Sequence, residues 1–514
     1  MRLTIVNWLL PAAAFLVVSG VRAGETTTTT TGETATTTAS YTETRAGIPR
    51  FNLDQAILTA LQRNPDILRT RQDIERTKGL YIEMRAAILP QLGATTQFQD
   101  IDPHLGAFST TGSGLSGTER SYSVDLQVTQ VIFAGGRIIS QIRSADFQRD
   151  STYYAFRDAI DLIVSTVRQQ FYLVQLDRAL IGVQEESVKL LQSQLQDQQN
   201  RFEAGTVPRF NVLQAQVALS NQYPQLITAR NNYRIAQLQL AKTLGLDFDP
   251  NRGDAAPLEC LGELAYVPRS MPITDAIAVA KVNRPFLKQQ KATVLSNRAQ
   301  IGVARSGFFP QLNATAGEEV RSSPFTDNIR DAKNGYIFGA TGTWAIWDWG
   351  TTYGRLKQAR SILEQSKITL DDDVRQVELE VQQAYSNLQQ GRELIQSQEK
   401  NVEQANEALR LASARLGAGA GTQLEVLDAR VQLTTAQSTQ LQALFTYNTA
   451  VAEFDRVTAT EVQYSTRLDE PSTRSKLKTD AAPTPAPKPT PLELNEPQQT
   501  TRTTTTSQLS TSGK

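Results

Sequence analysis

Most of the 514-residue chain consists of two consecutive copies of one unit. Residues 53–95 align without a gap with residues 273–315 at an offset of 220, which pairs Pro90 with Pro310. The offset then falls to 214, and the change lies around residues 96–132. A period of this length indicates a duplicated domain and is far too long for a solenoid repeat. Any fold proposed for one half must therefore also serve for the other.

Each copy contains two stretches with period-two alternation, which predicts two β-strands with one apolar and one polar face. The alternation is typical of a membrane strand, but a half-buried water-soluble sheet fits it equally well. In the first copy the apolar positions are Leu92, Ala94, Thr96 and Phe98, then Tyr122, Val124, Leu126 and Val128. In the second copy they are Leu312, Ala314 and Ala316, then Tyr336, Phe338, Ala340, Trp344 and Ile346.

The context of these strands favours a membrane. Loops rich in Gly, Ser, Pro and Asp connect the paired strands, at residues 102–117 and 322–334. Four strands cannot close a barrel, because the smallest bacterial barrels have about eight. Three chains of four strands each would supply twelve. Aromatic residues that suit a membrane-interface girdle occur near the strand ends: Tyr122, Phe133, Trp344, Trp347 and Trp349.

A long seam of residues spaced alternately by three and four predicts a continuous helix over residues 351–416. Large apolar residues alternate along it with small or polar ones, which lets neighbouring helices approach closely. The step from Val377 to Val381 is a four-residue stutter. At roughly 1.5 Å per residue such a helix is about 100 Å long. A self-contained antiparallel coiled coil without a membrane part also explains the seam, but not the strands.

Two Gly-containing turns, 214 residues apart, are predicted to form the tips of helical hairpins. Gly205, Gly419 and Gly421 are expected to take the positive φ that ends a helix. Thr206 or Thr422 is expected to accept amide hydrogen bonds and to begin the returning helix.

Composition excludes several classes of function. Basic and acidic residues balance at 52 each, and no basic cluster with interleaved aromatics occurs, so no nucleic-acid partner is expected. The only cysteine, Cys260, can form no intrachain disulfide, and the only histidine, His104, lies in a predicted loop. No catalytic constellation, metal-ligand set or cofactor site is visible, which argues against an enzyme.

The ends of the chain differ in character from the repeats. Residues 1–23 have the order of an export signal, with cleavage expected after Ala23. Residues 24–47 are Thr-rich and residues 466–514 Pro- and Thr-rich, and both are expected to be disordered. The repeats are predicted at 48–246 and 273–465, joined by a connector at 247–272. After the signal no segment reaches about 18 consecutive apolar residues, so no transmembrane helix is expected.

The residues resemble the TolC-like outer-membrane efflux protein family over nearly all of 48–465. The resemblance rests on Pro-Gln-Leu at 90–92 and 310–312, the strand-to-helix junctions at 131–137 and 347–350, and the two tips. It implies a mainly α fold with a membrane β-barrel portion, in which each duplicated unit combines a β-strand pair with a long helical hairpin.

The resemblance further implies a homotrimer, in which a twelve-stranded barrel in outer-membrane lipid continues into a periplasmic α-helical barrel. Such proteins are passive exit ducts of tripartite efflux or type I secretion systems in Gram-negative-type envelopes. A periplasmic adaptor opens the tip and links it to an inner-membrane pump. A secreted coiled-coil structural or adhesive protein is the alternative from another class. The sequence does not identify the cargo.

Family site residues can be placed on this sequence. The acidic gate would be Glu425 and Asp428, one helical turn apart, although both could be ordinary solvated charges. The first copy has Asn211 and Gln214 there. The family's basic residue in the second tip is replaced by Gly421.

Two further sets follow from the resemblance. Two arginines are the candidate substitutes for the missing inter-subunit lock, and four tip residues are expected to contact the adaptor. The candidate lock residues are Arg209 and Arg415. The tip residues are Gly205, Thr206, Gly419 and Thr422.

Overall fold

The computed structural model describes residues 49–100, 120–247, 257–322 and 331–460, all within the second of the chain's two units, Ile48–Lys514. In the first copy the helices are α1 (Leu53–Arg63), α2 (Pro65–Ala86), α3 (Arg137–Glu203) and α4 (Arg209–Thr243). In the second copy they are α5 (Ile273–Asn283), α6 (Pro285–Arg305), a 3₁₀ turn η2 (Ser306–Phe308), α7 (Thr351–Gly417) and α8 (Gln423–Thr458). The longer strands are β2 (Gln91–Asp100), β3 (Arg120–Phe133), β5 (Gln311–Ser322) and β6 (Lys333–Thr343), and the short pair is β1 (Arg50–Phe51) and β4 (Glu259–Cys260).

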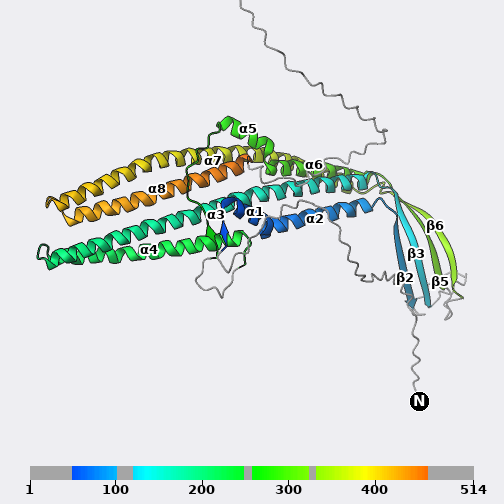
Figure 1. The fold of residues 1–514 in the computed structure, drawn as a ribbon. Coiled ribbons are helices and arrows are strands. Elements are labelled where there is room, and N and C mark those ends of the chain that lie inside the picture. Colours follow the sequence, from blue (N-terminus) through cyan, green and yellow to red (C-terminus); the bar gives the residue numbers. More distant parts are fainter. Residues whose placement is uncertain (1–48, 101–119, 248–256, 323–330, 461–514) are drawn as a thin grey trace, which may run out of the picture. The chain divides into compact units, whose positions relative to one another are not determined.

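The duplication is visible in the helices. Helices α3 and α7 are 67 residues each and begin 214 residues apart. At roughly 1.5 Å per residue each is about 100 Å long. The helix predicted over residues 351–416 is thus confirmed. Each long helix runs beside its returning partner, α4 or α8, and α3 also packs against α2, α6 and α8 (Figure 1).

The break between α1 and α2 has a clear local cause. Pro65 occupies the first turn of α2, where its missing N–H breaks no intrahelical bond. Asn64, only 3% exposed, caps that helix by accepting hydrogen bonds from the backbone N–H groups of Asp66 (2.8 Å) and Ile67 (3.4 Å). Its amide group donates to the carbonyl of Thr243 at 2.8 Å. One side chain therefore fixes the start of α2 and ties it to the end of α4.

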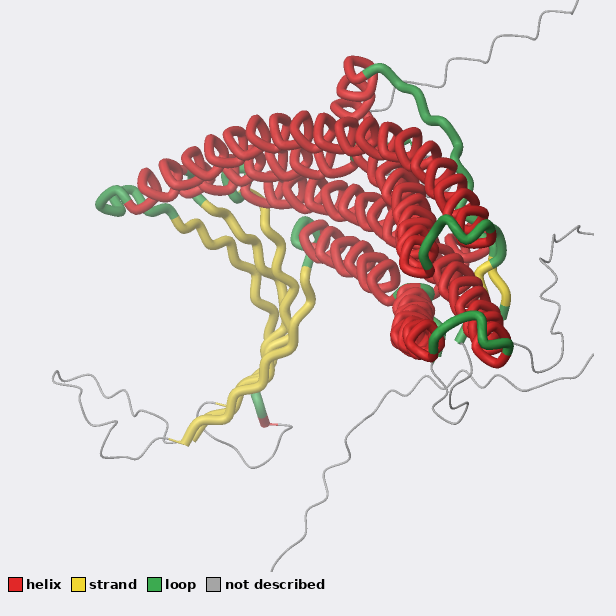
Figure 2. Tube along the Cα trace, turned by 90° about the vertical axis from the view of Figure 1, so that its left-hand side faces the viewer, coloured by secondary structure: helices red, strands yellow, loops and turns green. Residues whose placement is uncertain are grey.

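The four longer strands form one antiparallel sheet in the order β2-β3-β5-β6 (Figures 1 and 2). The two hairpins join through β3 and β5, where a bulge between Val131 and Phe133 shifts the register. The outer edges of β2 and β6 pair with no other strand among the described residues. The register brings odd-numbered residues of all four strands to one face and even-numbered residues to the other, apart from the bulge.

Two expected boundaries at the sheet were wrong. The strand expected to reach Ile346 ends at Thr343, because its last partner is Gln311 and the preceding Pro310 has no N–H to donate. The loop expected over residues 322–334 is shorter, since Ser322 and Lys333 already belong to strands. The other expected loop, 102–117, lies outside the described residues.

The helices are held together by apolar clusters, and each copy has a large one of its own. Side chains of α1, α3 and α4 form the first cluster, which includes Phe171 and Leu240, and Cys260 of β4 is buried in it. Helices α5, α7 and α8 form the second cluster, in which Val377 and Val381 are 1% and 0% exposed. Both residues of the stutter thus point into the core, as the seam requires.

Candidate functional site

The sheet exposes its apolar face. In β3, Val124, Leu126 and Val128 are 41%, 50% and 37% exposed. The polar residues that alternate with them are all partly buried: Ser123, Asp125 and Gln127. A sheet folded for water has the opposite arrangement, with its apolar residues covered.

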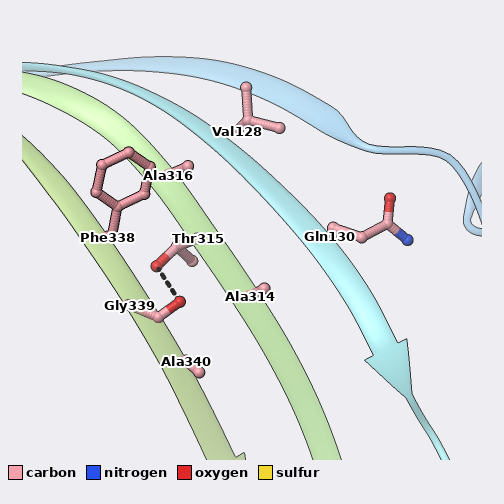
Figure 3. A pocket seen from close by; sticks show the side chains of 8 residues that line it. All are labelled: Val128, Gln130, Ala314, Thr315, Ala316, Phe338, Gly339 and Ala340. Atoms are coloured by element: carbon pink, nitrogen blue, oxygen red, sulfur yellow. Dashed lines mark hydrogen bonds between the residues drawn. The ribbon is translucent and has the colours of Figure 1, made fainter.

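The apolar face continues across the neighbouring strands. Val128 of β3, Ala316 of β5 and Phe338 of β6 line one shallow hollow (Figure 3), whose volume is about 450 Å³. Phe338 is 75% exposed and lies 5.5 Å from the ring of Tyr336, between centroids. The exposed apolar surface therefore spans the sheet and is not confined to one strand.

Aromatic residues cluster where the sheet passes into the helices. Trp347 and Trp349 are 75% and 89% exposed, and their rings meet edge to face at 5.7 Å. Trp344 donates from its indole Nε1 to the carbonyl of Phe308 at 3.2 Å. Trp349 has a φ of 53°, where a non-glycine residue is uncommon, and the equivalent residue of the first copy is Gly135 with a φ of 58°.

The first tip is closed by Gly205, whose φ is 74° as expected. Thr206 does not begin the returning helix. Its hydroxyl donates to the carbonyl of Arg201 at the end of α3 (2.9 Å), and the residue before α4 is Pro208, which offers no side-chain cap. The expectation for Thr206 was therefore wrong, because the hydroxyl satisfies the helix that ends instead of the one that starts.

The second tip differs in two respects. Gly419 has the expected positive φ of 73°, but Gly421 does not take one. Space at Gly421 is tight instead, because a Cβ there would lie 3.0 Å from the backbone nitrogen of Leu416. Thr422 caps α8 as predicted, accepting a hydrogen bond from the backbone N–H of Glu425 at 3.3 Å.

The charged residues of the second tip lie at the start of α8. Glu425 is half-buried and Asp428 exposed. Arg415, at the end of α7, forms an ion pair with Glu425 at 3.5 Å within the same chain, with side chains 61% and 41% exposed. Arg209 lies at the first tip, where it is exposed and forms no ion pair with a described residue. The structure thus brings one candidate lock residue, Arg415, to a candidate gate residue and leaves the other, Arg209, apart.

A polar contact behind the tips was not anticipated. Gln198 of α3 donates to Gln423 of α8 at 3.2 Å, and Arg430 donates to Gln194 at 2.7 Å. Burial lowers the pKa of Arg430. These contacts join the two hairpins, yet they connect residues more than 200 positions apart, so no local spacing could reveal them. The only sequence signal is the presence of glutamines where a helical seam normally carries apolar residues.

The described residues contain no group of three or more His, Cys, Asp or Glu side chains placed to hold a metal ion. His104 lies outside them. Among the helices that the structure describes, none is both long enough and apolar enough to cross a membrane.

Comparison with known proteins identifies the class. The sequence model for outer membrane efflux proteins matches residues 56–246 and 276–460, which together make up most of the chain. The chain belongs to the outer membrane efflux protein family, as the resemblance predicted. It is therefore a TolC-like outer membrane channel protein, and its relatives are channels of efflux pumps, not enzymes.

Individual relatives cover most of both chains. The toluene efflux pump outer membrane protein TtgC of Pseudomonas putida is 27% identical over 415 residues, covering 75% of this chain and 78% of its own. The cation efflux system protein CusC of Escherichia coli O157:H7 is 23% identical over 411 residues, covering 77% and 84%. The crystal structure of the Campylobacter jejuni CmeC outer membrane channel shares the fold, with a TM-score of 0.70 at 15% identity over 79% of this chain and 85% of that one.

Proposed function

We propose that this protein is one third of a passive outer-membrane exit duct, which an adaptor opens at its periplasmic tip. One observation carries the proposal, namely that the sheet exposes its apolar face across its strands, while in β3 the polar residues that alternate with the apolar ones are partly buried. Lipid outside and water inside are the surroundings in which that arrangement is stable. The alternative, a secreted coiled-coil structural or adhesive protein, does not explain why the sheet exposes its apolar face.

The sheet edges support a trimer. The outer edges of β2 and β6 carry backbone groups that no described strand satisfies, and such groups are costly in lipid. Four strands are too few to close on themselves, since the smallest bacterial barrels have about eight. If β6 of each chain pairs with β2 of the next, three chains of four strands form a closed barrel of twelve.

The helical part supports the same assembly. Helix α4 packs against α3 and exposes apolar side chains on its other surface. Phe210, Val217 and Ile227 are 69%, 58% and 65% exposed. A neighbouring chain that covers them would extend the barrel into a helical duct below the membrane, in the periplasm. We place the two repeats of that duct at residues 48–246 and 273–465.

The tips are the proposed meeting point with the adaptor, which in turn links the duct to an inner-membrane pump. Glycines at both turns leave the backbone accessible, and we assign Gly205, Thr206, Gly419 and Thr422 to this contact. The pump would select the cargo. The relatives favour this division, since one is named for toluene efflux and another for cation efflux while both resemble this chain.

The second tip supplies the proposed gate. Threefold symmetry would turn Asp428 and Glu425 into rings of carboxylates, which attract cations and repel one another. Arg415 partly neutralises Glu425 within each chain, so Asp428 contributes the less compensated charge. We propose Arg415 as an electrostatic brake on the gate. Arg209 has no such partner among the described residues and is the weaker candidate for a lock.

Single-channel recording in planar bilayers tests the gate. Glu425→Ala with Asp428→Ala should weaken selectivity for cations and block by multivalent cations. Arg415→Ala should act in the opposite direction, because it releases the charge of Glu425. Glu407→Ala is the matched control, since Glu407 also forms an exposed ion pair on α7, with Arg410. Unchanged selectivity in both gate variants would refute the gate assignment.

A further inference from the structure

A basic cavity lies where the sheet joins the helices of the second copy. Its volume is about 470 Å³, and it lies between the start of α3, the end of α6 and the start of α7. None of the side chains that line it is acidic. The polar ones are Arg137, Asn297, Gln300, Ser306, Gln311, Thr352, Arg355 and Gln358.

The two arginines of this cavity lack counter-charges. Neither Arg137 nor Arg355 forms an ion pair with a carboxylate that the structure describes, and the Nε of Arg137 is buried without a hydrogen-bond acceptor among the described residues. A buried donor left in this way costs stability, so it calls for an acceptor from outside the chain. The carboxylate of Asp348 is already engaged, accepting from the backbone N–H groups of Gly350 (3.0 Å) and Thr352 (2.8 Å).

The internal duplication shows that packing of this helix pair does not need Arg355. The equivalent groove of the first copy, between α2 and α3, is built with different chemistry. Gln141 stands where the second copy has Arg355, Leu80 where it has Gln300, and Glu83 where it has Val303. The same helix pair thus packs without the arginine and with an acidic residue. The basic character of the second groove therefore points to a ligand.

The position of the cavity indicates the kind of ligand. Its rim includes Gln311, the first residue of β5, and η2, whose Phe308 carbonyl accepts the hydrogen bond from Trp344. Tryptophans of this kind favour the polar headgroup level of a membrane. Val303, Ala359 and Ile362 add an apolar wall to the polar one.

We propose that this cavity binds the phosphate group of a phospholipid headgroup, held by the guanidinium groups of Arg137 and Arg355. Guanidinium groups bind phosphate oxygens through paired, charge-assisted hydrogen bonds, and the neighbouring amides can donate further ones. The phosphate chemistry rests on the cavity alone. The inference that this phosphate belongs to a phospholipid rests on the proposed function, in which the junction of sheet and helices lies at the membrane surface.

Calorimetric titration of the full-length protein in a non-ionic detergent tests the site. The probes are short-chain phosphatidylglycerol, inorganic phosphate and short-chain diacylglycerol, which lacks the phosphate. Arg137→Thr with Arg355→Gln installs the residues that the chain itself uses at the equivalent positions, Thr351 and Gln141, so folding should be preserved. Loss of each charge-assisted contact should weaken binding of phosphatidylglycerol about tenfold or more. Arg360→Gln, an exposed arginine of α7 outside the cavity, is the matched control and should bind as the unchanged protein does.

Two results support the site and separate the sources of phosphate. Binding of phosphatidylglycerol alone indicates a headgroup, and binding of inorganic phosphate as well indicates a general phosphate site. Equal binding of diacylglycerol, or no loss in the double variant, would overturn the proposal. If the double variant fails to fold, the single variant Arg355→Gln replaces it, and unchanged phosphatidylglycerol binding in that variant would overturn the proposal. Channel recording on the same preparation separates the phosphate site from the proposed duct. A protein that conducts but does not bind phosphate refutes the phosphate site and leaves the duct standing.

Discussion

Gly391 in the middle of α7 sets how closely α7 and α8 approach. A Cβ on this residue would lie 3.0 Å from the Cα of Tyr447 and 3.3 Å from its Cβ and backbone nitrogen. Overpacking of this kind costs about 1–3 kcal/mol. The higher helix propensity of alanine offsets part of this cost, since alanine is more favourable than glycine in a helix by roughly 0.5–1 kcal/mol. Gly391→Ala should therefore lower the free energy of unfolding by up to about 2.5 kcal/mol.

Gly182 in α3 provides the matched control, because it is also helical but a Cβ there meets nothing within 4 Å. Gly182→Ala should raise the free energy of unfolding by about 0.5–1 kcal/mol. The two alanine variants share the propensity gain, so the difference between them measures the overpacking, about 1–3 kcal/mol. Denaturant unfolding in detergent, followed by far-ultraviolet circular dichroism, provides the values. Equal changes in both variants would refute close packing at Gly391.

Three further outcomes can be checked in the same way. Burial raises the pKa of Asp177 to about 6 from its usual value of 3.8, so the folded protein holds a proton that the unfolded chain has released between these pH values. Stability is therefore lost as pH rises through this window, and Asp177→Asn should recover up to about 3 kcal/mol at neutral pH and flatten the pH dependence; a variant that is no more stable at pH 7 contradicts the assignment. Asn64→Ala removes a buried cap and should cost about 1–2 kcal/mol in thermal or denaturant unfolding, and an unchanged midpoint would speak against it. Thr422→Ala should cost about 1 kcal/mol locally, seen as faster amide hydrogen exchange in the first turn of α8 but not of α4; equal exchange at both tips would show that the cap is unimportant.

Much of the fold could be predicted because its signals are local and occur twice. The seam from residue 356 to 416 has the period of a packed helix, and α7 spans Thr351–Gly417. The strand alternation is equally local, and the observed register aligns the apolar positions of all four strands on one face. Each pattern recurs at a fixed offset, which makes a chance origin of the helix and strand patterns implausible.

What could not be predicted depends on contacts across the chain. The early end of β6 follows from its pairing with β5, where Pro310 removes the next donor. The advantage of glycine at 421 comes from the nearby backbone of Leu416 and not from its own φ. The contact of Gln198 with Gln423 joins two hairpins that no local rule brings together.

The candidate site was predicted only in part. Family resemblance pointed to Glu425 and Asp428, whose role as a gate stays a prediction, and local rules correctly assigned the cap to Thr422. The pairing of Arg415 with Glu425 depends on how the turn folds back on the end of α7. The basic cavity was invisible in the sequence, because Arg137 and Arg355 belong to different copies and meet only through the packing of α3, α6 and α7.

Disulfide crosslinking between β2 and β6 tests most directly whether sister chains complete the sheet. With Cys260→Ser as background, one cysteine replaces Thr95 of β2 and a second is scanned along the odd positions of β6, on the same face of the sheet. Oxidation in outer membranes should join different chains and yield dimers and trimers in denaturing gels, with none larger. Disulfides formed within single chains, from a sheet closed on itself, would contradict the account.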